Sequence, residues 1–168
     1  MIIQTTLVVL MVIGFGGVVL GIIGWLSETI RNKSISNLKV EDLTIPKSKF
    51  VQLVNDWCWE NLKSNNPKPT VTISYNKNKT VSGVYYPFNN SIVVYINNQT
   101  HLINIVDVTI HEFTHSTQKT KGFDKLYNQY TQEKGYWNNP FEQECEKVSE
   151  KNKHQCLQDL ITNNNILK

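Results

Sequence analysis

Apolar and polar residues alternate along the chain in a way that predicts a helix, three strands and a second helix. From Pro46, a residue favoured at the first position of a helix, apolar side chains recur at helical spacing as far as Leu62. Three shorter stretches predict strands: 70–75 alternates at every second residue, as half-buried strands do, and 80–86 and 91–96 are rich in β-branched and aromatic residues. Apolar residues return to helical spacing from Ile103 to Gln118, which predicts the second helix.

The chain begins with an apolar run that predicts a membrane anchor. The run from Leu7 to Leu26 carries no charge, and as a helix it is long enough to cross a hydrocarbon core of about 30 Å. A cleaved signal peptide is the alternative, but no Lys or Arg precedes the run and no small-residue cleavage site follows it. The sequence therefore predicts a single-pass transmembrane helix at 1–26 and a juxtamembrane linker at 27–45.

Basic residues and glycines predict how the membrane helix is oriented and whether it associates with another helix. The basic residues that follow it favour a cytoplasmic location for the rest of the chain, by the positive-inside rule: Arg31, Lys33 and Lys39. Glycines at spacings of three and four share one face of the predicted helix: Gly14, Gly17, Gly21 and Gly24. Glycine is common in membrane helices, but such a face also permits close approach of another helix. The stripe therefore predicts a homo-oligomer or a helix partner in the bilayer.

Length, charge and cysteine content narrow the class of protein. The chain has 168 residues, enough for one domain and an appendage, and its net charge of +3 is too small for a nucleic-acid-binding surface. The three cysteines, Cys58, Cys145 and Cys156, form no C-x-x-C pair, which argues against a structural zinc ribbon. We expect them to be buried free thiols.

The motif H-E-x-x-H occupies residues 111–115 of the second predicted helix. Residues four apart share a helix face, so His111 and His115 can present two imidazoles to one metal ion. Glu112, one position round the helix, can reach a water bound to that ion. The motif therefore predicts a zinc site with two ligands and a general base in one helical turn.

The order of helix, three short strands and H-E-x-x-H helix resembles the minimal catalytic half of the zincin metallopeptidases. The resemblance implies an α+β domain at 46–162 with a small, twisted, mainly antiparallel sheet, followed by further C-terminal helices and a polar tail at 163–168. In zincins the edge strand nearest the cleft aligns an extended peptide by strand addition. The strand just before the motif helix is the candidate for this role, through Val93, Val94 and Tyr95.

The resemblance also implies a third zinc ligand, because a catalytic zinc takes three protein ligands and keeps a position for water. Lys121 stands where the metzincin branch has its third histidine, which excludes that branch. The gluzincin branch takes a glutamate from a later helix, and the segment after Pro140 resembles its E-x-x-x-D stretch. Carried over, Glu142 is the third ligand and Glu146 accepts from a histidine N–H. Glu144, on a different helix face, is the alternative ligand.

Other polar residues near the motif have less defined roles. His101 is expected in an exposed loop, and His154 on a helix surface or, alternatively, as a donor in the cleft. Three tyrosines lie between the motif and the second acidic segment, and one of them is a candidate for stabilising an oxyanion: Tyr127, Tyr130 and Tyr136.

These observations predict a membrane-anchored metallopeptidase that binds one zinc ion and hydrolyses a peptide or protein substrate. Glu112 takes the proton of the zinc-bound water and passes it to the leaving amine in this mechanism. The alternative is a non-enzymatic, membrane-tethered structural or interaction protein, of a virus or a mobile element, that retains a zincin scaffold.

Overall fold

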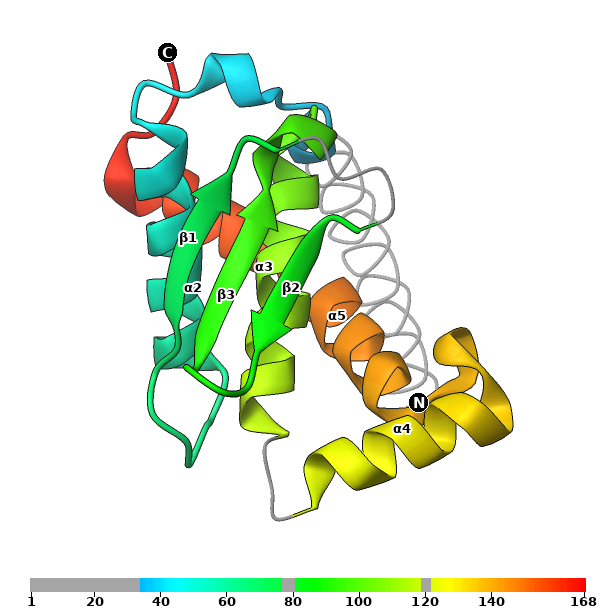
Figure 1. The fold of residues 1–168 in the computed structure, drawn as a ribbon. Coiled ribbons are helices and arrows are strands. Elements are labelled where there is room, and N and C mark those ends of the chain that lie inside the picture. The colour runs from blue at the N-terminus through cyan, green and yellow to red at the C-terminus, as the bar shows by residue number, and fades with distance from the viewer. Residues whose placement is uncertain (1–33, 77–80, 119–121) are drawn as a thin grey trace, which may run out of the picture. The chain divides into compact units, whose positions relative to one another are not determined.

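The computed structural model describes residues 34–76, 81–118 and 122–168, and Ile35–Lys168 form one compact unit (Figure 1). Its helices and strands include the predicted helix, three strands and second helix in that order, together with a helix between the motif helix and Pro140 that was not predicted. They are η1 (Val40–Asp42), α2 (Lys47–Asn61), β1 (Thr70–Ser74), β2 (Gly83–Tyr86), β3 (Ser91–Tyr95), η2 (Ile96–Asn98), α3 (Leu102–Thr117), α4 (Phe123–Lys134), η3 (Tyr136–Asn138) and α5 (Pro140–Asn164).

The sheet has three strands in the order β1-β3-β2 and is mixed. β3 pairs in parallel with β1 over five residues and antiparallel with β2 over four, so the expectation of a mainly antiparallel sheet is wrong. β3 is the central strand, which also corrects its assignment as the substrate-aligning edge. Val93 and Val94 are paired with strands on both sides, and Tyr95 pairs with Ser74 of β1 and donates its backbone N–H to Ser82, so their backbone is not available to a peptide.

Helices α2 and α3 cover one face of the sheet, and α5 packs against α3 on the side away from the strands (Figure 1). α3 is central because apolar residues surround most of its circumference, and eleven of its sixteen residues are buried. Its buried hydroxyls return to the helix backbone, as Thr114 does by donating to the carbonyl of Ile110 at 2.8 Å. The indole of Trp57 on α2 donates to Asp159 on α5 at 2.9 Å and joins these two helices.

Both ends of the described chain belong to the packed unit, which is longer than the expected 46–162. Val40 and Leu43, from the segment expected as a linker at 27–45, lie in the hydrophobic core. Ile166, from the expected polar tail at 163–168, is fully buried. The two segments are joined where Leu43 and Leu167 form an antiparallel bridge.

The structure corrects the expected membrane-spanning architecture. None of the helices that it describes is long and apolar enough to cross a membrane. α3 is apolar but has 16 residues, and α5 has 25 residues but carries many charges. The residues expected to form the anchor, 1–26, and the glycines Gly14, Gly17, Gly21 and Gly24 lie outside the described residues. The fold class is therefore an α+β unit with a mixed sheet, and the single-pass localisation is not supported.

Candidate metal centre

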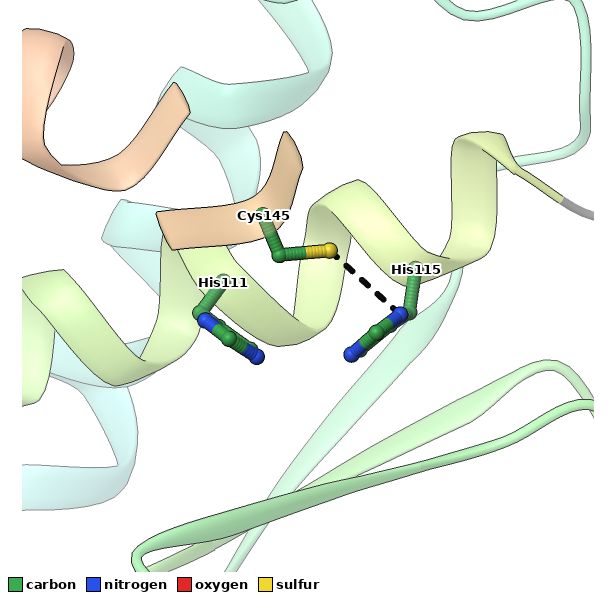
Figure 2. A group of neighbouring side chains, drawn as sticks. All are labelled: His111, His115 and Cys145. Atoms are coloured by element: carbon green, nitrogen blue, oxygen red, sulfur yellow. Dashed lines mark hydrogen bonds between the residues drawn. The ribbon is translucent and has the colours of Figure 1, made fainter. Parts of the chain in front are cut away.

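Two histidines project from one face of α3, one helical turn apart. The ring centroids of His111 and His115 are 5.0 Å apart, and their far edges turn toward one another (Figure 2). His115 is buried, whereas the side chain of His111 is 19% exposed. The motif thus forms the helical pair that the spacing predicted, with one histidine on the solvent side.

The carboxylate of Glu142 lies between the two imidazoles. Its Oε2 is 3.2 Å from Nε2 of His111, and its Oε1 is 3.3 Å from Nε2 of His115. Two ligand atoms held about 2.0–2.1 Å from a tetrahedral zinc are about 3.3 Å apart. The two nitrogen–oxygen distances are therefore those expected of ligands that share one zinc ion.

The start of α5 fixes Glu142 in this position. Pro140 begins the helix, as the sequence indicated, and the side chain of Asn139 caps it by accepting from the backbone N–H of Phe141 at 3.0 Å. Glu142 follows in the first turn and is only 5% exposed. A carboxylate so buried needs charged or hydrogen-bonding partners, and the two histidines are its nearest cationic groups.

Gln118 determines which nitrogen of His115 faces Glu142. The amide nitrogen of Gln118 donates to the carbonyl of Phe141 at 3.0 Å and to Glu144 at 2.8 Å. Its amide oxygen therefore faces Nδ1 of His115, at 3.0 Å. Since that oxygen only accepts, Nδ1 carries a proton, and Nε2 is the nitrogen that meets Glu142, as an N–H donor or, with a metal bound, as a ligand. A lone pair that faces a carboxylate oxygen is favourable only with a cation or a proton between them.

Cys145 of α5 adds a third metal-binding atom near the histidines. Its Sγ is 3.3 Å from Nδ1 of His115, and ligand atoms of His111, His115 and Cys145 all lie within 4.8 Å of one another (Figure 2). This group could hold a metal ion. However, burial and the carboxylates of Glu142 and Glu112 raise the pKa of the Cys145 thiol, which opposes the thiolate that binds metals. Glu142, the ligand expected from the sequence, instead faces Nε2 of both rings.

Glu112 lies on the neighbouring face of α3, against strand β2. Its side chain is 9% exposed and accepts a hydrogen bond from the backbone of Tyr85. Gly83 permits this close approach, because a Cβ there would lie 2.6 Å from Cγ1 of Val108 and 2.9 Å from Cγ of Glu112. β2, an outer strand of the sheet, therefore occupies the place beside Glu112 that was expected of β3.

Two of the three candidate tyrosines contact Glu142. The hydroxyl of Tyr127 on α4 donates to its Oε1, and the hydroxyl of Tyr136 in η3 also bonds its carboxylate. Tyr130 instead packs its ring against Phe141, with centroids 5.9 Å apart. The segment between the ligands thus reaches the site through two phenols.

The pKa values of the two carboxyl groups of the site, Glu112 and Glu142, are shifted in opposite directions. Burial raises the pKa of Glu112 above its ordinary value of 4.5, although His115 and His111 oppose this effect. Burial acts in the same direction on Glu142, but hydrogen bonds from His111, His115 and Tyr127 outweigh it and hold the pKa of that carboxyl far below its usual range. Glu142 is suited to be an ionised ligand, and Glu112 to exchange a proton.

Burial alone would lower the pKa of the His111 imidazole, but hydrogen bonding to Glu142 and the nearby charge of Glu112 raise it. Without a metal, a proton on His111 therefore compensates part of the negative charge of these two carboxylates. A divalent cation at the same place would compensate more of it, because it brings two charges and requires the imidazole to be neutral.

The remaining sequence candidates have other positions. Glu146 has its Oε2 at 4.0 Å from Nδ1 of His111 and a side chain that is 72% exposed, so it makes no hydrogen bond to that ring. Glu144 holds Gln118 rather than facing the histidine Nε2 atoms. His101 precedes α3, about 15 Å along the helix from His111, and His154 lies about 18 Å along α5 from Glu142. Neither of these histidines contributes to the site.

No protein-family model matches the chain, and neither a curated protein nor a solved structure shows significant similarity to it. The candidate metal centre is therefore identified from the positions of its side chains alone.

The sequence did not indicate three residues that shape the site: Gln118, Cys145 and Gly83. Gln118 had a signal, because it follows His115 by three residues and so lies near it on the helix. Cys145 had one as well, since it lies three residues after Glu142 on α5. Gly83 carried no comparable signal, because its role depends on how β2 lies against α3.

Proposed function

We propose that the chain is a zinc-dependent metallopeptidase. One observation carries the proposal: a buried, ionised carboxylate stands 3.2 and 3.3 Å from the Nε2 atoms of two histidines one helical turn apart. His111, His115 and Glu142 would hold one zinc ion. The bound ion would lower the pKa of a coordinated water toward 7 and polarise the carbonyl of the peptide to be cleaved.

The protein side chains have separate roles in this proposal. Glu112 takes a proton from the attacking water and delivers it to the nitrogen of the leaving amine, a role favoured by its raised pKa. Tyr127 and Tyr136 hold Glu142 by hydrogen bonds. β2 is the strand beside Glu112, and a peptide that adds to its outer edge would present its carbonyl groups along the site.

The test combines metal analysis with peptide cleavage by the full chain. The wild-type protein should bind one zinc ion and cleave members of a library of randomised synthetic decapeptides. Glu112→Gln should keep the zinc and lose about 10³-fold in cleavage rate, because it removes the general base. Glu142→Ala should lose zinc as well, whereas Glu150→Ala, an exposed acid on the same helix, should change neither property.

Two results would contradict the proposal in different ways. A wild-type protein that binds no zinc would remove its basis. Stoichiometric zinc with no cleavage that depends on Glu112 would instead favour the non-enzymatic alternative, in which the same residues form a structural metal site.

A further inference from the structure

A cavity of about 370 Å³ lies where α2 and α3 begin, at the opposite end of α3 from the candidate metal centre. Lys47, the first residue of α2, and His101, which directly precedes α3, both line it. The other lining residues come from the segment before α2 and from the turn after η2: Lys39, Val40, Glu41, Gln99 and Thr100. His101 is about 15 Å along α3 from His111, and this cavity shares no lining residue with the cavities beside the metal centre.

The wall of this cavity contains a buried polar side chain whose donor is unused. Gln99 is 9% exposed, and its amide nitrogen Nε2 has no hydrogen-bond partner among the described residues. A buried N–H group without an acceptor is costly, and native proteins pair such groups with protein, water or a bound ion. Because Gln99 lines a cavity, an oxygen atom of a molecule held there can supply the acceptor.

Positive charge gathers around the same cavity. Lys39 and Lys47 each bring an ammonium group, and Glu41 is the one acid among the described residues that line it. Glu41 is largely exposed, and its Oε1 lies 3.5 Å from Nζ of Lys39. Lys47 has no acidic group within ion-pairing distance in the described part of the chain. The cavity therefore has at least one ammonium group that no carboxylate of the protein neutralises.

The two helices that begin at the cavity lack the groups that usually compensate the positive end of a helix. Neither Pro46 nor His101 caps its helix with a side chain, and neither first turn holds an acidic residue. By contrast, α4 and α5 carry Asp124 and Glu142 in their first turns. α2 instead begins with Lys47, which is unfavourable at this end unless an anion accompanies it.

We propose that this cavity binds a phosphate group, either as inorganic phosphate or as the monoester of a small molecule. Its oxygens would accept from Nε2 of Gln99 and from the ammonium of Lys47, and Lys39 would join them on release from Glu41. The starts of α2 and α3 would add the attraction of their dipoles. The volume exceeds that of a phosphate ion and leaves room for the rest of a small molecule. This binding does not depend on the proposed metallopeptidase function.

The first experiment titrates the full chain with sodium phosphate by isothermal titration calorimetry, with ionic strength held constant by sodium chloride. We expect saturable binding of one phosphate per chain, with a Kd of about 1 mM or lower. Glycerol 3-phosphate, titrated in the same way, distinguishes the two sources: tighter binding than phosphate assigns the site to an ester, and weaker binding to the free ion. No saturable binding of either compound would overturn the proposal.

A variant of the metal centre separates the two sites. Glu142→Ala removes a candidate zinc ligand and should bind phosphate with the same Kd as the wild type, because Glu142 does not line this cavity. Loss of phosphate binding in Glu142→Ala would place the anion at the metal centre and overturn the proposal.

The second experiment compares two lysines in the first turn of α2. Lys47→Gln should raise the phosphate Kd about tenfold, because it removes a charged donor from the cavity. Lys49→Gln removes the same charge from an exposed position of the same turn that does not line the cavity, and should raise the Kd less than twofold. Equal increases in Kd would mean general attraction by positive charge, without a site.

The third experiment tests the buried amide. Gln99→Leu should raise the phosphate Kd about fivefold, because it removes a donor that reaches the anion. The urea midpoint of the ligand-free protein should stay the same or rise, since Nε2 of Gln99 has no partner to lose among the described residues. An unchanged Kd, with or without a lower midpoint, would show that the amide takes no part in binding and would overturn its assigned role.

Discussion

α3 and α4 both reach the candidate site, but the unit holds them in different ways. Eleven of the sixteen residues of α3 are buried, whereas α4 has one buried residue, Phe123, among its twelve. α3 carries both histidines and Glu112, and α4 contributes the hydroxyl of Tyr127. The candidate metal ligands and the candidate general base, whose positions must be fixed, therefore come from the well-packed helix. The poorly packed helix, α4, contributes a hydroxyl that holds Glu142 by a hydrogen bond.

The largest expected effect is the loss in free energy of unfolding when a side chain of α3, rather than of α4, is shortened. Phe113→Ala in α3 should destabilise the unit by about 3–5 kcal/mol, since it removes a fully buried ring. Leu126→Ala in α4 should cost no more than about 0.5 kcal/mol, because that side chain is already 40% exposed. Urea unfolding followed by circular dichroism measures both. Equal losses would show that α4 is packed as firmly as α3.

The next effect concerns the support of a ligand at the end of α3. Gln118→Leu removes the acceptor of the His115 Nδ1 proton, so the ring loses its fixed tautomer and orientation. We expect the zinc Kd to rise by about 10- to 100-fold in a competition titration with a chelator. Gln129→Leu, an exposed glutamine on α4, is the matched control. An unchanged Kd for Gln118→Leu would exclude this support.

A smaller effect is expected from α4 itself. Tyr127→Phe removes one hydrogen bond to a charged oxygen of Glu142 and leaves the ring stacked near Phe141. The zinc Kd should rise about tenfold, while the free energy of unfolding of the metal-free protein should change less than in Phe113→Ala. Tyr130→Phe, on the same helix but packed against Phe141, should leave the zinc Kd unchanged. A Tyr127→Phe protein as unstable as Phe113→Ala would mean that α4 is needed to hold the fold.

The smallest expected effect is a pH-dependent contribution of Asp56 to the stability of the fold. Asp56 on α2 accepts from Lys68 and Gln52, each at 2.7 Å. Burial opposes ionisation of Asp56, but these partners outweigh it and hold its pKa below the ordinary 3.8. A lowered pKa stabilises the fold at pH values above 3.8, and this contribution is lost as the pH falls through the lowered value.

Asp56→Asn should therefore cost less than about 1 kcal/mol at neutral pH, because the pair is partly exposed. The difference from wild type should shrink below pH 4, which urea titrations at several pH values would measure. A difference that persists in acid would assign the loss to packing rather than to charge.

The positions of α2, the three strands and α3 could be predicted from the sequence because they follow from local spacing, whereas α4 was not predicted. The order of the strands in the sheet could not, since the residue pattern of a strand indicates that it is extended and partly buried but not which strand lies between the other two. β3 directly precedes α3 in the chain and was therefore expected at the cleft. It lies in the centre because β2 returns antiparallel along its other side and leaves Gly83 against Glu112.

The candidate site was also predictable only where its residues follow a local pattern. His111, Glu112 and His115 follow from one helical turn, and Glu142 from resemblance to a known segment. The role expected of Glu146 was not found, because it stands 4.0 Å from His111 with most of its side chain in solvent. Gln118 has a comparable place at His115 instead, at 3.0 Å. Such supporting contacts depend on the rotation of α5 against α3, which no local pattern encodes.

The chain order of the ligands has a consequence for folding. His115 and Glu142 enclose α4 and η3, so a zinc ion bound to both would close this segment into a loop, as a covalent cross-link does. Because the site exists only in the folded chain, binding of the ion to these two residues favours the folded state. Within the loop, α4 has one buried residue to hold it. Metal binding would therefore order most strongly the segment whose own packing holds it least.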